Sequence, residues 1–373
     1  MTLDSFLSSG TSPGQQHRTC RVAVAGFGHV GSAVARRLTG PESPPGIILT
    51  HVFDRRAPEK RRAFRTSALT WTTRFEDLLS SAADVIVETI GGTDSSWIRD
   101  ALIAGKSVVT ANKQVIARDG AALGALAARQ GRQLRFEAAV GGAMPIVRAV
   151  SDGLAGERIT RLTAVLNGTS NAVLSQIDET GCTMEEAVAD ARSRGWAEAD
   201  PAGDLDGADA RAKLAILCAL AFALRVDPRS IDARSTAHIG PAAFERAKAR
   251  GATIRQIAHA EYDAERSTLA AWVAPALVPR DSLFGRTTGP RNAAIIGGVH
   301  AGEIGIFGTG AGGDATAVAV LADVIAIARD RAAVIPVRSL TTPAIVRGVP
   351  PGGGIFDGLG GRASSTCPLA EAV

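Results

Sequence analysis

The chain has 373 residues, of which 46% are hydrophobic and 21% are charged, a composition that predicts a globular protein of about two domains. The net charge of +4 comes from 41 basic and 37 acidic side chains without a block of like charge, so we expect no nucleic-acid partner. No apolar run approaches the roughly 20 residues of a membrane span, and the four cysteines lack the spacing of a zinc site or a disulfide framework, so we expect a cytoplasmic protein.

The first predicted elements are a strand, a glycine loop and a helix. Residues 1–19 are polar, without the apolar core of a signal peptide, and we expect a disordered tail. An apolar run at residues 22–25 precedes three glycines in G-x-G-x-x-G spacing, and a helical pattern follows. In such loops the first glycine allows a tight turn, the second lets the backbone approach a pyrophosphate, and the third lets helix and strand pack closely. The order predicts a dinucleotide site, with loop contacts Gly26, Phe27, Gly28, His29, Val30 and Gly31.

The second predicted strand, residues 47–53, bears on which cofactor this loop binds. It ends in Asp54, at the place where an acidic side chain binds the ribose hydroxyls of NAD. Arg55 and Arg56 follow, and arginines near this place hold the 2′-phosphate of NADP. The two signals conflict. We expect both cofactors to be accepted, with NAD favoured because a carboxylate repels a phosphate dianion.

Strands and helices continue to alternate to about residue 141. We predict strands at residues 85–87, 108–110 and 134–137, and helices at residues 95–104 and 120–129. This alternation predicts an α/β fold with a Rossmann-like, doubly wound parallel sheet, in which ligands bind at the carboxyl ends of the strands. Thr89, Lys113 and Glu137 lie at those ends, and we expect Thr89 and Lys113 to contact the cofactor.

The pattern then changes to longer helices and strands, as expected for an α+β domain that holds substrate. We assign residues 20–141 to the nucleotide-binding domain and residues 142–307 to this second domain. Within it, a capping box at Thr183 and Glu186 begins a helix that Gly195 ends. Residues 308–335 are predicted to form a second glycine loop, which includes Gly310, and a helix that returns to the nucleotide site. Residues 336–373 are assigned to a tail.

An acidic segment precedes a helix that carries a single lysine, Lys213. The apolar positions of this helix have the period of an amphipathic helix, and Asp209 and Lys213 lie on adjacent turns. An acid and a lysine at this spacing are often only a small helix stabiliser, so the pair alone leaves a structural and a catalytic role open. The acidic residues of the segment are Glu198, Asp200, Asp204, Asp206 and Asp209, and the apolar positions are Ala210, Leu214, Leu217 and Ala221.

From residue 20 to residue 331 the chain resembles homoserine dehydrogenases, in the ordered stretches AGFGHVG, VVTANK, EAAVGGAMPI, LNGTSN, GWAEADP with DLDGADARAKLAIL, and GTGAGGDATA. Members of that family interconvert L-homoserine and L-aspartate 4-semialdehyde with NAD or NADP, on the route to threonine, methionine and isoleucine. They are usually homodimers joined through the sheet of the substrate domain. The resemblance implies the same reaction, cofactors and homodimer for this chain.

The resemblance also implies roles for individual residues. Lys213 is similar to the family's acid/base lysine, Asp209 to the partner of that lysine, and Lys113 to a lysine beside nicotinamide and substrate. Carboxylates suit the ammonium group of homoserine, and a lysine suits the proton that leaves the alcohol with the hydride. The positions similar to the substrate site are Glu198, Asp204, Gly195 and Lys213. The family's structural monovalent cation, usually sodium, is held by positions similar to Glu137, Val140, Gly142 and Met144.

The alternatives to this interpretation depend on details of the chain. Thioester-forming semialdehyde dehydrogenases need an activated cysteine, but Cys182 and Cys218 have the setting of buried structural thiols. A non-catalytic redox sensor that binds nicotinamide would keep the glycines without needing Asp209 or Lys213. A dehydrogenase of another hydroxy-amino acid stays open because the chain departs from the family's pattern at His29, Trp196 and Asp314.

The residues after Arg331 bear on regulation. They are too few, and too interrupted by prolines and glycines at positions 350–354, for the two βαβ units of an ACT domain. Through such a domain threonine inhibits many bacterial members of the family. The chain therefore resembles a short form, and we expect no threonine inhibition through a separate site. We expect the tail to pack over the nucleotide-binding domain or to be disordered.

Overall fold

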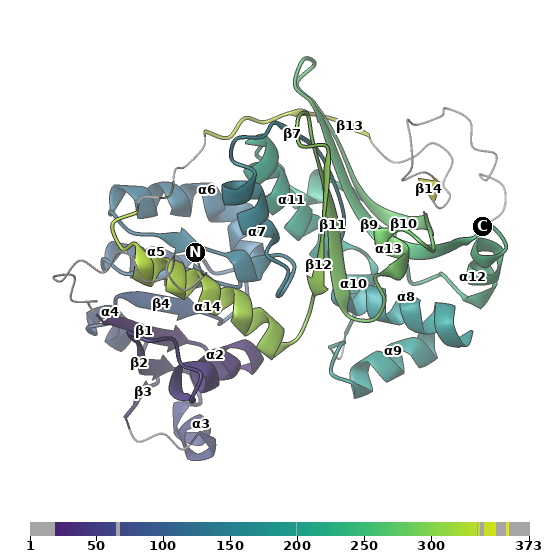
Figure 1. The fold of residues 1–373 in the computed structure, drawn as a ribbon. Helices are drawn as coiled ribbons and strands as arrows, with labels where there is room; N and C mark the ends of the chain where they lie inside the picture. The colour runs from purple at the N-terminus through teal and green to yellow at the C-terminus, as the bar shows by residue number, and fades with distance from the viewer. Residues whose placement is uncertain are drawn as a thin grey trace, which may run out of the picture.

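Two β-sheets lie side by side in the structure, a computed structural model (Figure 1). It describes residues 19–64, 68–198, 200–333, 335, 339–347 and 356–357. The predicted N-terminal tail therefore lies outside the described residues, apart from Thr19, and so does most of the predicted C-terminal tail. Among the described residues, no helix is long and apolar enough to cross a membrane.

The first sheet confirms the predicted parallel, doubly wound fold. Its strand order is β3-β2-β1-β4-β5-β6, and every neighbouring pair is parallel. The order reverses between β1 and β4, and in such sheets a ligand crevice opens outside the carboxyl ends of the strands at that point. The strands are β1 (Cys20–Ala25), β2 (Ile47–Phe53), β3 (Thr70–Thr72), β4 (Val85–Glu88), β5 (Ser107–Thr110) and β6 (Leu134–Arg135).

Helices cover both faces of this first sheet (Figure 1). Alternate residues of β1 point to opposite faces, so Val22 and Val24 pack with α2 and α14, whereas Ala23 and Ala25 pack with α5 and α6. The helices are α2 (His29–Thr39), α3 (Ala57–Ala63), α4 (Glu76–Ser80), α5 (Ser96–Ile103), α6 (Lys113–Arg129) and α14 (Gly313–Arg329). The short elements α3, β3 and α4 were not predicted, because segments of three to seven residues carry too little periodicity.

Two boundaries differ from the prediction where side chains cap the backbone. Helix α6 begins at Lys113, seven positions before the predicted start, because Asn112 Oδ1 accepts a hydrogen bond of 3.1 Å from Val115 N. The predicted strand at 134–137 ends at Arg135, and Glu137–Ala139 forms the 3₁₀ turn η1. The main-chain N–H of Glu137 donates to the carboxylate of Asp323 on α14 at 2.8 Å, which turns the chain away from the sheet.

The second sheet is mixed, as expected for an α+β substrate domain. Its main order is β12-β11-β7-β9-β10-β13, antiparallel from β12 to β10. Strand β13 runs parallel to β10, so these four residues of the tail join the second sheet. For them the expectation that the tail packs over the nucleotide-binding domain or is disordered was wrong. Their backbone groups pair with an edge that would otherwise stay open. The strands are β7 (Ile159–Val165), β8 (Asp232–Ala233), β9 (Ala252–Asp263), β10 (Thr268–Pro279), β11 (Arg291–Gly298), β12 (Glu303–Thr309), β13 (Ala344–Arg347) and β14 (Phe356–Asp357).

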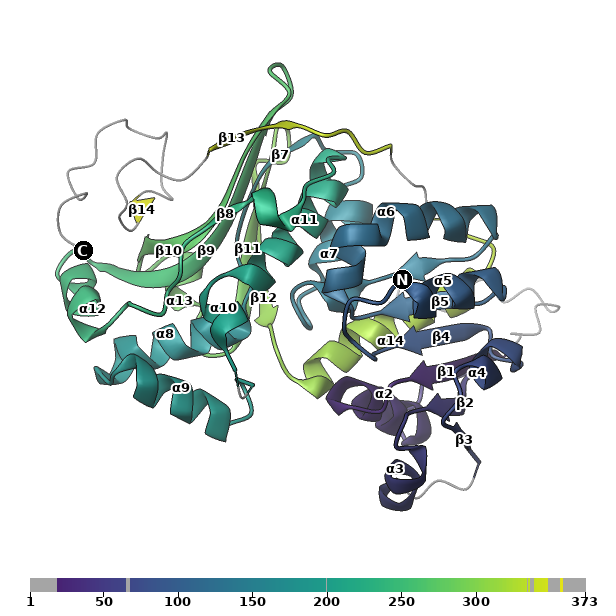
Figure 2. The same cartoon turned by 180° about the vertical axis from the view of Figure 1, so that it is seen from behind.

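Helix α11 lies between the two sheets (Figures 1 and 2). It was predicted as a helix with one apolar stripe, but Ala215, Ile216 and Cys218 are buried as well, because both the second sheet and α6 cover it. The predicted capping box at Thr183 and Glu186 is present at the start of α9. The helical elements of this half are α7 (Ile146–Arg148), η2 (Ala149–Gly153), α8 (Gly168–Thr180), α9 (Met184–Ser193), α10 (Ala202–Leu205), α11 (Ala208–Phe222), η3 (Pro228–Ser230), α12 (Pro241–Lys248) and α13 (Leu283–Arg286).

Candidate active site

The glycine loop after β1 is closely packed at its first and third glycines and open at its second. Gly26 has φ +93°, and a Cβ on it would lie 2.8 Å from the carbonyl carbon of Thr89. A Cβ on Gly31 would lie 1.9 Å from the carbonyl oxygen of Gly26. A Cβ on Gly28 would meet nothing within 4 Å. The packing of the loop therefore does not require a glycine at the middle position. A glycine is expected there if a pyrophosphate approaches the backbone.

Helix α2 presents its N-terminus at this loop without a side-chain cap. Gly28 is the N-cap residue, and no side chain accepts from the first turn. Uncapped N–H groups at a helix start attract an anion. The glycine loop before α14 brings a second helix start here, because a Cβ on Gly313 would lie 2.7 Å from the carbonyl oxygen of His29. These features fit the phosphates of a dinucleotide.

Asp54 is held against the glycine loop by two main-chain hydrogen bonds. Its Oδ2 accepts from Phe27 N and its Oδ1 from Arg56 N, both at 2.8 Å. The Phe27 side chain points into a cluster with Phe64 and Trp71, so only its backbone faces the loop. The side chains of Arg55, Arg56 and His29 are exposed, and that of Val30 is half-buried.

Thr89 supports the loop from β4. Its hydroxyl donates to the carbonyl oxygen of Gly26 at 2.8 Å. The residue before it, Glu88, is buried and accepts from Ile90 N at 2.8 Å, so the end of β4 is also held by its own side chain. Burial raises the pKa of the Glu88 carboxyl, and the hydrogen bonds from Thr110 and from the backbone oppose that change. Both residues therefore shape the floor of the crevice at the point where the strand order reverses.

Two lysines from different halves of the chain meet at one buried aspartate. Lys113 Nζ lies 2.8 Å from Asp209 Oδ1, and Lys213 Nζ lies 2.7 Å from Asp209 Oδ2. Lys113 begins α6 at the edge of the first sheet, while Asp209 and Lys213 lie one turn apart on α11. The side chain of Asp209 is 9% exposed, that of Lys213 12% and that of Lys113 37%. The sequence predicted all three residues, and the structure brings them together.

The charges of this group stabilise one another. Burial raises the pKa of Asp209, but the two ammonium groups outweigh burial and hold the pKa well below the usual range of an aspartate. Burial lowers the pKa of Lys113, but the carboxylates of Asp209, Asp204 and Glu198 outweigh it and raise that pKa. Asp209 and Lys113 are therefore both ionised at neutral pH.

Asn167 links this group to Asp204, and sequence analysis did not single it out. Asn167 Nδ2 donates to Asp204 Oδ1 at 2.6 Å and to Asp209 Oδ2 at 2.8 Å. Its Oδ1 accepts from Ser170 N at 2.7 Å and caps α8. Burial raises the pKa of Asp204, and the Asn167 hydrogen bond opposes that change. The available signal was an asparagine directly before a helical pattern, in the LNGTSN stretch.

Lys213 is also anchored to a main-chain carbonyl that a second asparagine supports. Lys213 Nζ donates to Leu166 O at 2.8 Å, and Asn292 Nδ2 donates to the same oxygen at 3.3 Å. Gly310 packs on the amide of Asn292, because a Cβ at that glycine would lie 2.2 Å from Asn292 Oδ1. The second glycine loop thus touches the anchor of Lys213. No local pattern identified Asn292.

Gly195 and Glu198 lie on the segment that leads from α9 to the lysines. Gly195 has φ +72° and ends α9, as predicted, and its N–H donates to Arg192 O at 3.0 Å. The side chain of Glu198 is exposed, and its charge contributes to raising the pKa of Lys113. Thr169 Oγ1 donates to Trp196 O at 2.7 Å and ties this segment to α8.

The predicted cation loop follows the first sheet. Both carboxylate oxygens of Glu137 accept main-chain hydrogen bonds of 2.9 Å, from Val147 N and Arg148 N. Burial raises the pKa of Glu137 to about 7, and the Arg148 N–H opposes that change. A cation here would therefore rely on main-chain carbonyl oxygens of the loop, which suits a hard monovalent ion. The described residues hold no group of three His, Cys, Asp or Glu side chains that would bind a metal.

The three cysteines in the described part of the chain do not form a nucleophilic site. Cys218 is buried on α11, and burial raises the pKa of its thiol to about 12. Cys20 is buried at the start of β1, and burial raises its pKa too. Cys182 was expected to be buried but is half-buried, because it lies in the turn between α8 and α9. Raised pKa values disfavour the thiolate that thioester chemistry needs.

Two family models match the chain. The model described as "Homoserine dehydrogenase, NAD binding domain" covers residues 26–137, and the model described as "Homoserine dehydrogenase" covers residues 145–325. Among similar proteins, homoserine dehydrogenase from Mycobacterium leprae is 38% identical over 84% of this chain and 73% of its own length. That from Bacillus subtilis is 32% identical over 84% and 74%.

Solved structures agree with these matches. A homoserine dehydrogenase from Thiobacillus denitrificans has a TM-score of 0.82 at 29% identity, over 88% of this chain and 80% of the other. A hyperthermophilic archaeal homoserine dehydrogenase in complex with NADPH has a TM-score of 0.71 at 25% identity, over 85% and 100%. Both halves of the chain and the order of their motifs thus match one family. The chain belongs to the homoserine dehydrogenase family.

Proposed function

We propose that this chain interconverts L-homoserine and L-aspartate 4-semialdehyde with NAD or NADP, as a step toward threonine, methionine and isoleucine. The observation that carries the proposal is the contact of Lys113 and Lys213 with one buried residue, Asp209. Asn167 connects this group to Asp204, and the same chain has a glycine loop that fits a dinucleotide. The redox-sensor alternative would not need the lysines. Their convergence at a buried carboxylate supports catalysis.

Lys213 is the proposed acid and base of the reaction. An ammonium has three N–H donors, and Lys213 uses one on Asp209 and one on the carbonyl of Leu166. The third is free to donate its proton to the aldehyde oxygen during reduction, and the neutral amine recovers a proton from the hydroxyl during oxidation. When bound, the nicotinamide supplies or accepts the hydride. Asp209 and the Leu166 carbonyl hold this nitrogen in place for the proton transfer.

Asp204 and Glu198 are the proposed partners of the substrate's ammonium group. Charge-assisted hydrogen bonds to carboxylates suit an ammonium, and one Asp204 oxygen already accepts from Asn167, which orients the carboxylate. Gly195 is proposed to contribute indirectly, because its turn after α9 leads the chain to Glu198. Lys113 begins α6 and is more than a third exposed, so its ammonium is accessible to the anionic end of the substrate and to the nicotinamide side.

The cofactor proposal rests on the loop after β1. We place the pyrophosphate at Gly28 and the start of α2, and the adenosine ribose at Asp54. Both cofactors are expected to bind, with NAD favoured. His29, Val30, Arg55 and Gly310 are proposed as further contacts. A structural sodium ion is proposed at main-chain oxygens of Glu137, Val140, Gly142 and Met144, and exchange of sodium for choline in the buffer would lower the melting temperature.

A homodimer through the second sheet is also proposed. The face of this sheet away from α11 carries Phe307, which is 66% exposed, and the half-buried Ile295. Large apolar side chains in a row on a sheet face are typical of an interface. Sedimentation of the full chain would measure the mass. We propose the cytoplasm as the compartment, because the three cysteines that the structure describes are free thiols and two of them are buried.

A spectrophotometric assay of nicotinamide tests the reaction. The full chain is expected to oxidise NADH or NADPH with aspartate 4-semialdehyde and to reduce NAD or NADP with homoserine. Succinate semialdehyde is a matched control, because it lacks only the ammonium group. Its kcat/KM is expected to be about a hundredfold lower or more, since the half-buried Asp204 then lacks the substrate's ammonium group as a partner. Cofactor binding without turnover of either substrate would contradict the proposal and favour the sensor.

A further inference from the structure

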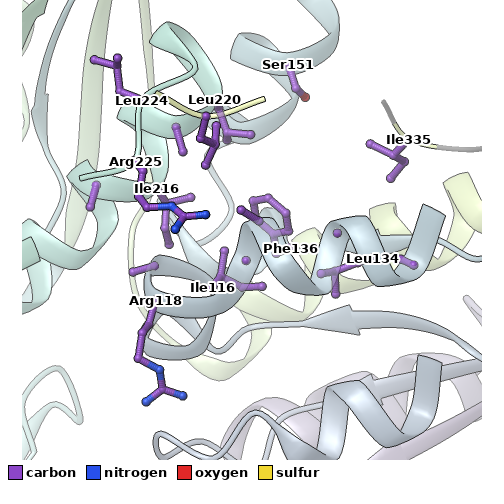
Figure 3. A pocket seen from close by; sticks show the side chains of 18 of the residues that line it. Ile116, Arg118, Leu134, Phe136, Ser151, Ile216, Leu220, Leu224, Arg225 and Ile335 are labelled. Atoms are coloured by element: carbon purple, nitrogen blue, oxygen red, sulfur yellow. The ribbon is translucent and has the colours of Figure 1, made fainter. Parts of the chain in front are cut away.

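A cavity of about 320 Å³ lies behind the active-site lysines, between α6, α11 and η2. It is separate from the dinucleotide loop. Ile335 and Leu340, which follow α14 in the chain, also line it, and Ile335 can be seen at one side (Figure 3). Its lining is mostly apolar and includes Ile116, Leu134, Phe136, Ile216 and Leu224. A pocket of this size holds a compact hydrocarbon group of about five or six carbons.

The polar groups at the cavity give it a positive edge. The side chain of Arg225 lies among Ile116, Ile216 and Phe136 (Figure 3), and among the described residues its guanidinium has no ion-pair partner. The main chain of Arg225 is held, because its N–H donates to Thr341 O at 2.7 Å. The arginine is thus placed at the cavity by its backbone while its charge is left for a ligand.

The other polar side chains do not cancel this charge. Arg118 points away from the cavity (Figure 3), because its guanidinium binds Asp119 and the carbonyl of Thr93. Arg132 is a second exposed cation that lines the cavity. Asp152 is the one acidic residue of the lining, and its Oδ1 accepts from Ser151 Oγ at 3.0 Å. A basic edge on an apolar cavity complements a small amphipathic anion.

The cavity shares its two main walls with the active site. Ile116 lies one turn after Lys113 on α6, and Ile216 lies one turn after Lys213 on α11. A ligand between these side chains acts on the separation of the two helices. That separation sets the contact of Lys113 with Asp209, which is 2.8 Å long and joins the same two helices.

We propose that this cavity is an effector site for a small branched aliphatic carboxylate. The hydrocarbon part fills the space between α6 and α11, and the carboxylate pairs with Arg225. Occupancy spreads the helices and weakens the contact of Lys113 with Asp209, so the ligand inhibits. The inhibition rests on the function proposed above, whereas the binding does not.

Binding is tested first, by calorimetric titration of the full chain with 4-methylpentanoate. Saturable binding is expected with a Kd on the order of 1 mM, given the size of the probe. 4-Methylpentylamine, which has the same body and the opposite charge, and acetate, which has the charge without the body, are expected not to bind. Arg225→Gln should weaken binding about tenfold. Arg246→Gln, on α12, is the matched control and should not change it.

A variant that fills the cavity tests whether the ligand binds there and not elsewhere on the protein. Ala219→Phe places a ring into the lining and should abolish binding, with folding checked by circular dichroism. No saturable binding by the unmodified chain would overturn the proposal, and so would binding that both variants retain. Equal binding of the amine and the acid would show that Arg225 does not select the ligand, which also overturns it.

Inhibition is then measured at saturating 4-methylpentanoate with aspartate 4-semialdehyde as substrate. A fall in kcat of about fivefold is expected, and it should be lost in Arg225→Gln at the same ligand concentration. Binding without any change in kcat or KM would overturn the coupling. If the chain did not turn over the semialdehyde at all, the calorimetric result would still stand, so the two proposals fail separately.

Discussion

Lys113 Nζ and Asp209 Oδ1 lie 2.8 Å apart and join the two halves of the molecule at the site of reaction. Lys113 begins the helix after β5, at the crevice where the cofactor is proposed to bind, while Asp209 lies on α11 beside the second sheet. Asp209 is buried whereas Lys113 is more than a third exposed, so removal of Asp209 would leave the charge of the mostly buried Lys213 without its carboxylate partner. The relative position of the two halves therefore decides whether the bound nicotinamide and Lys213 can reach the same substrate molecule.

Lys213→Ala should lower kcat by about a hundredfold or more, because a positioned acid is lost from the reacting oxygen. Cofactor binding should stay unchanged, measured by fluorescence titration with NADH. Lys248→Ala, an exposed lysine on α12, is the matched control and should keep full activity. Unchanged turnover of Lys213→Ala would remove this lysine from the mechanism.

Gly28→Ala and Gly31→Ala should differ in kind. A Cβ at Gly31 would clash with the carbonyl oxygen of Gly26, so this variant should unfold at lower denaturant concentration. A Cβ at Gly28 has open space and a φ of −82°, so this variant should fold normally yet bind cofactor about tenfold more weakly, because the methyl group stands where the pyrophosphate approaches. Denaturation and cofactor titration of both variants measure this. Normal affinity in folded Gly28→Ala would place the pyrophosphate elsewhere.

Asn167→Ala should lower kcat/KM by about tenfold or more, because Asp204 and Asp209 lose their shared donor. It should also lose about 1 kcal/mol of stability as a helix cap. Thr183→Ala removes a cap from α9 and serves as the control, with a similar loss of stability and unchanged kinetics. Equal kinetics in the two variants would make Asn167 a structural residue alone.

Asp54→Ser should shift the cofactor preference toward NADP by about tenfold, since the carboxylate that disfavours a 2′-phosphate is removed. The unmodified chain is expected to accept both cofactors and to favour NAD. The ratio of kcat/KM for the two cofactors measures the shift. A strong preference for NADP in the unmodified chain that persists in Asp54→Ser would show that Arg55 and Arg56 dominate.

The stability of the protein should fall as the pH rises through 7, in part because of Glu137. Its pKa is about 7 in the folded chain against an ordinary value of 4.5, so folding takes up a proton between these values. The contribution is present in full below about pH 4.5 and is lost above pH 7, with a size of about 3 kcal/mol. Urea unfolding at pH 5 and pH 8, at one protein concentration, measures the loss. Glu137→Gln should show a smaller loss, and an identical pH dependence would exclude this carboxyl as the cause.

Local patterns were sufficient where the interactions are local. The spacing of Gly26, Gly28 and Gly31 predicted the loop because the clash of Gly31 with Gly26 arises within one turn of chain. The neighbouring turns of α11 that carry Asp209 and Lys213 followed from helical periodicity for the same reason. The predicted parallel, doubly wound sheet needed only the alternation of strands and helices.

Local patterns failed where distant segments decide. Helix α11 was predicted to have one apolar stripe, but it is buried on two sides. The second buried side depends on α6, which is distant in the sequence. Strand β13 pairs with β10, and the pattern of residues 344–347 does not predict which strand it pairs with. The start of α6 was predicted at Gly120, but the helix begins seven residues earlier because the side chain of Asn112 caps it there.

The nucleotide loop and the class of fold could be predicted from the sequence, and so could the proposed roles of the two lysines and their aspartate, since each prediction rests on spacing within a few residues or on ordered motifs. Three contacts needed the folded chain: Lys113 reaches Asp209, Asn167 bridges two carboxylates 37 and 42 residues away, and Asn292 supports the Leu166 carbonyl 126 residues away. These contacts depend on how two sheets pack around α11, and that packing is set by burial of side chains from the whole chain, which no short stretch encodes.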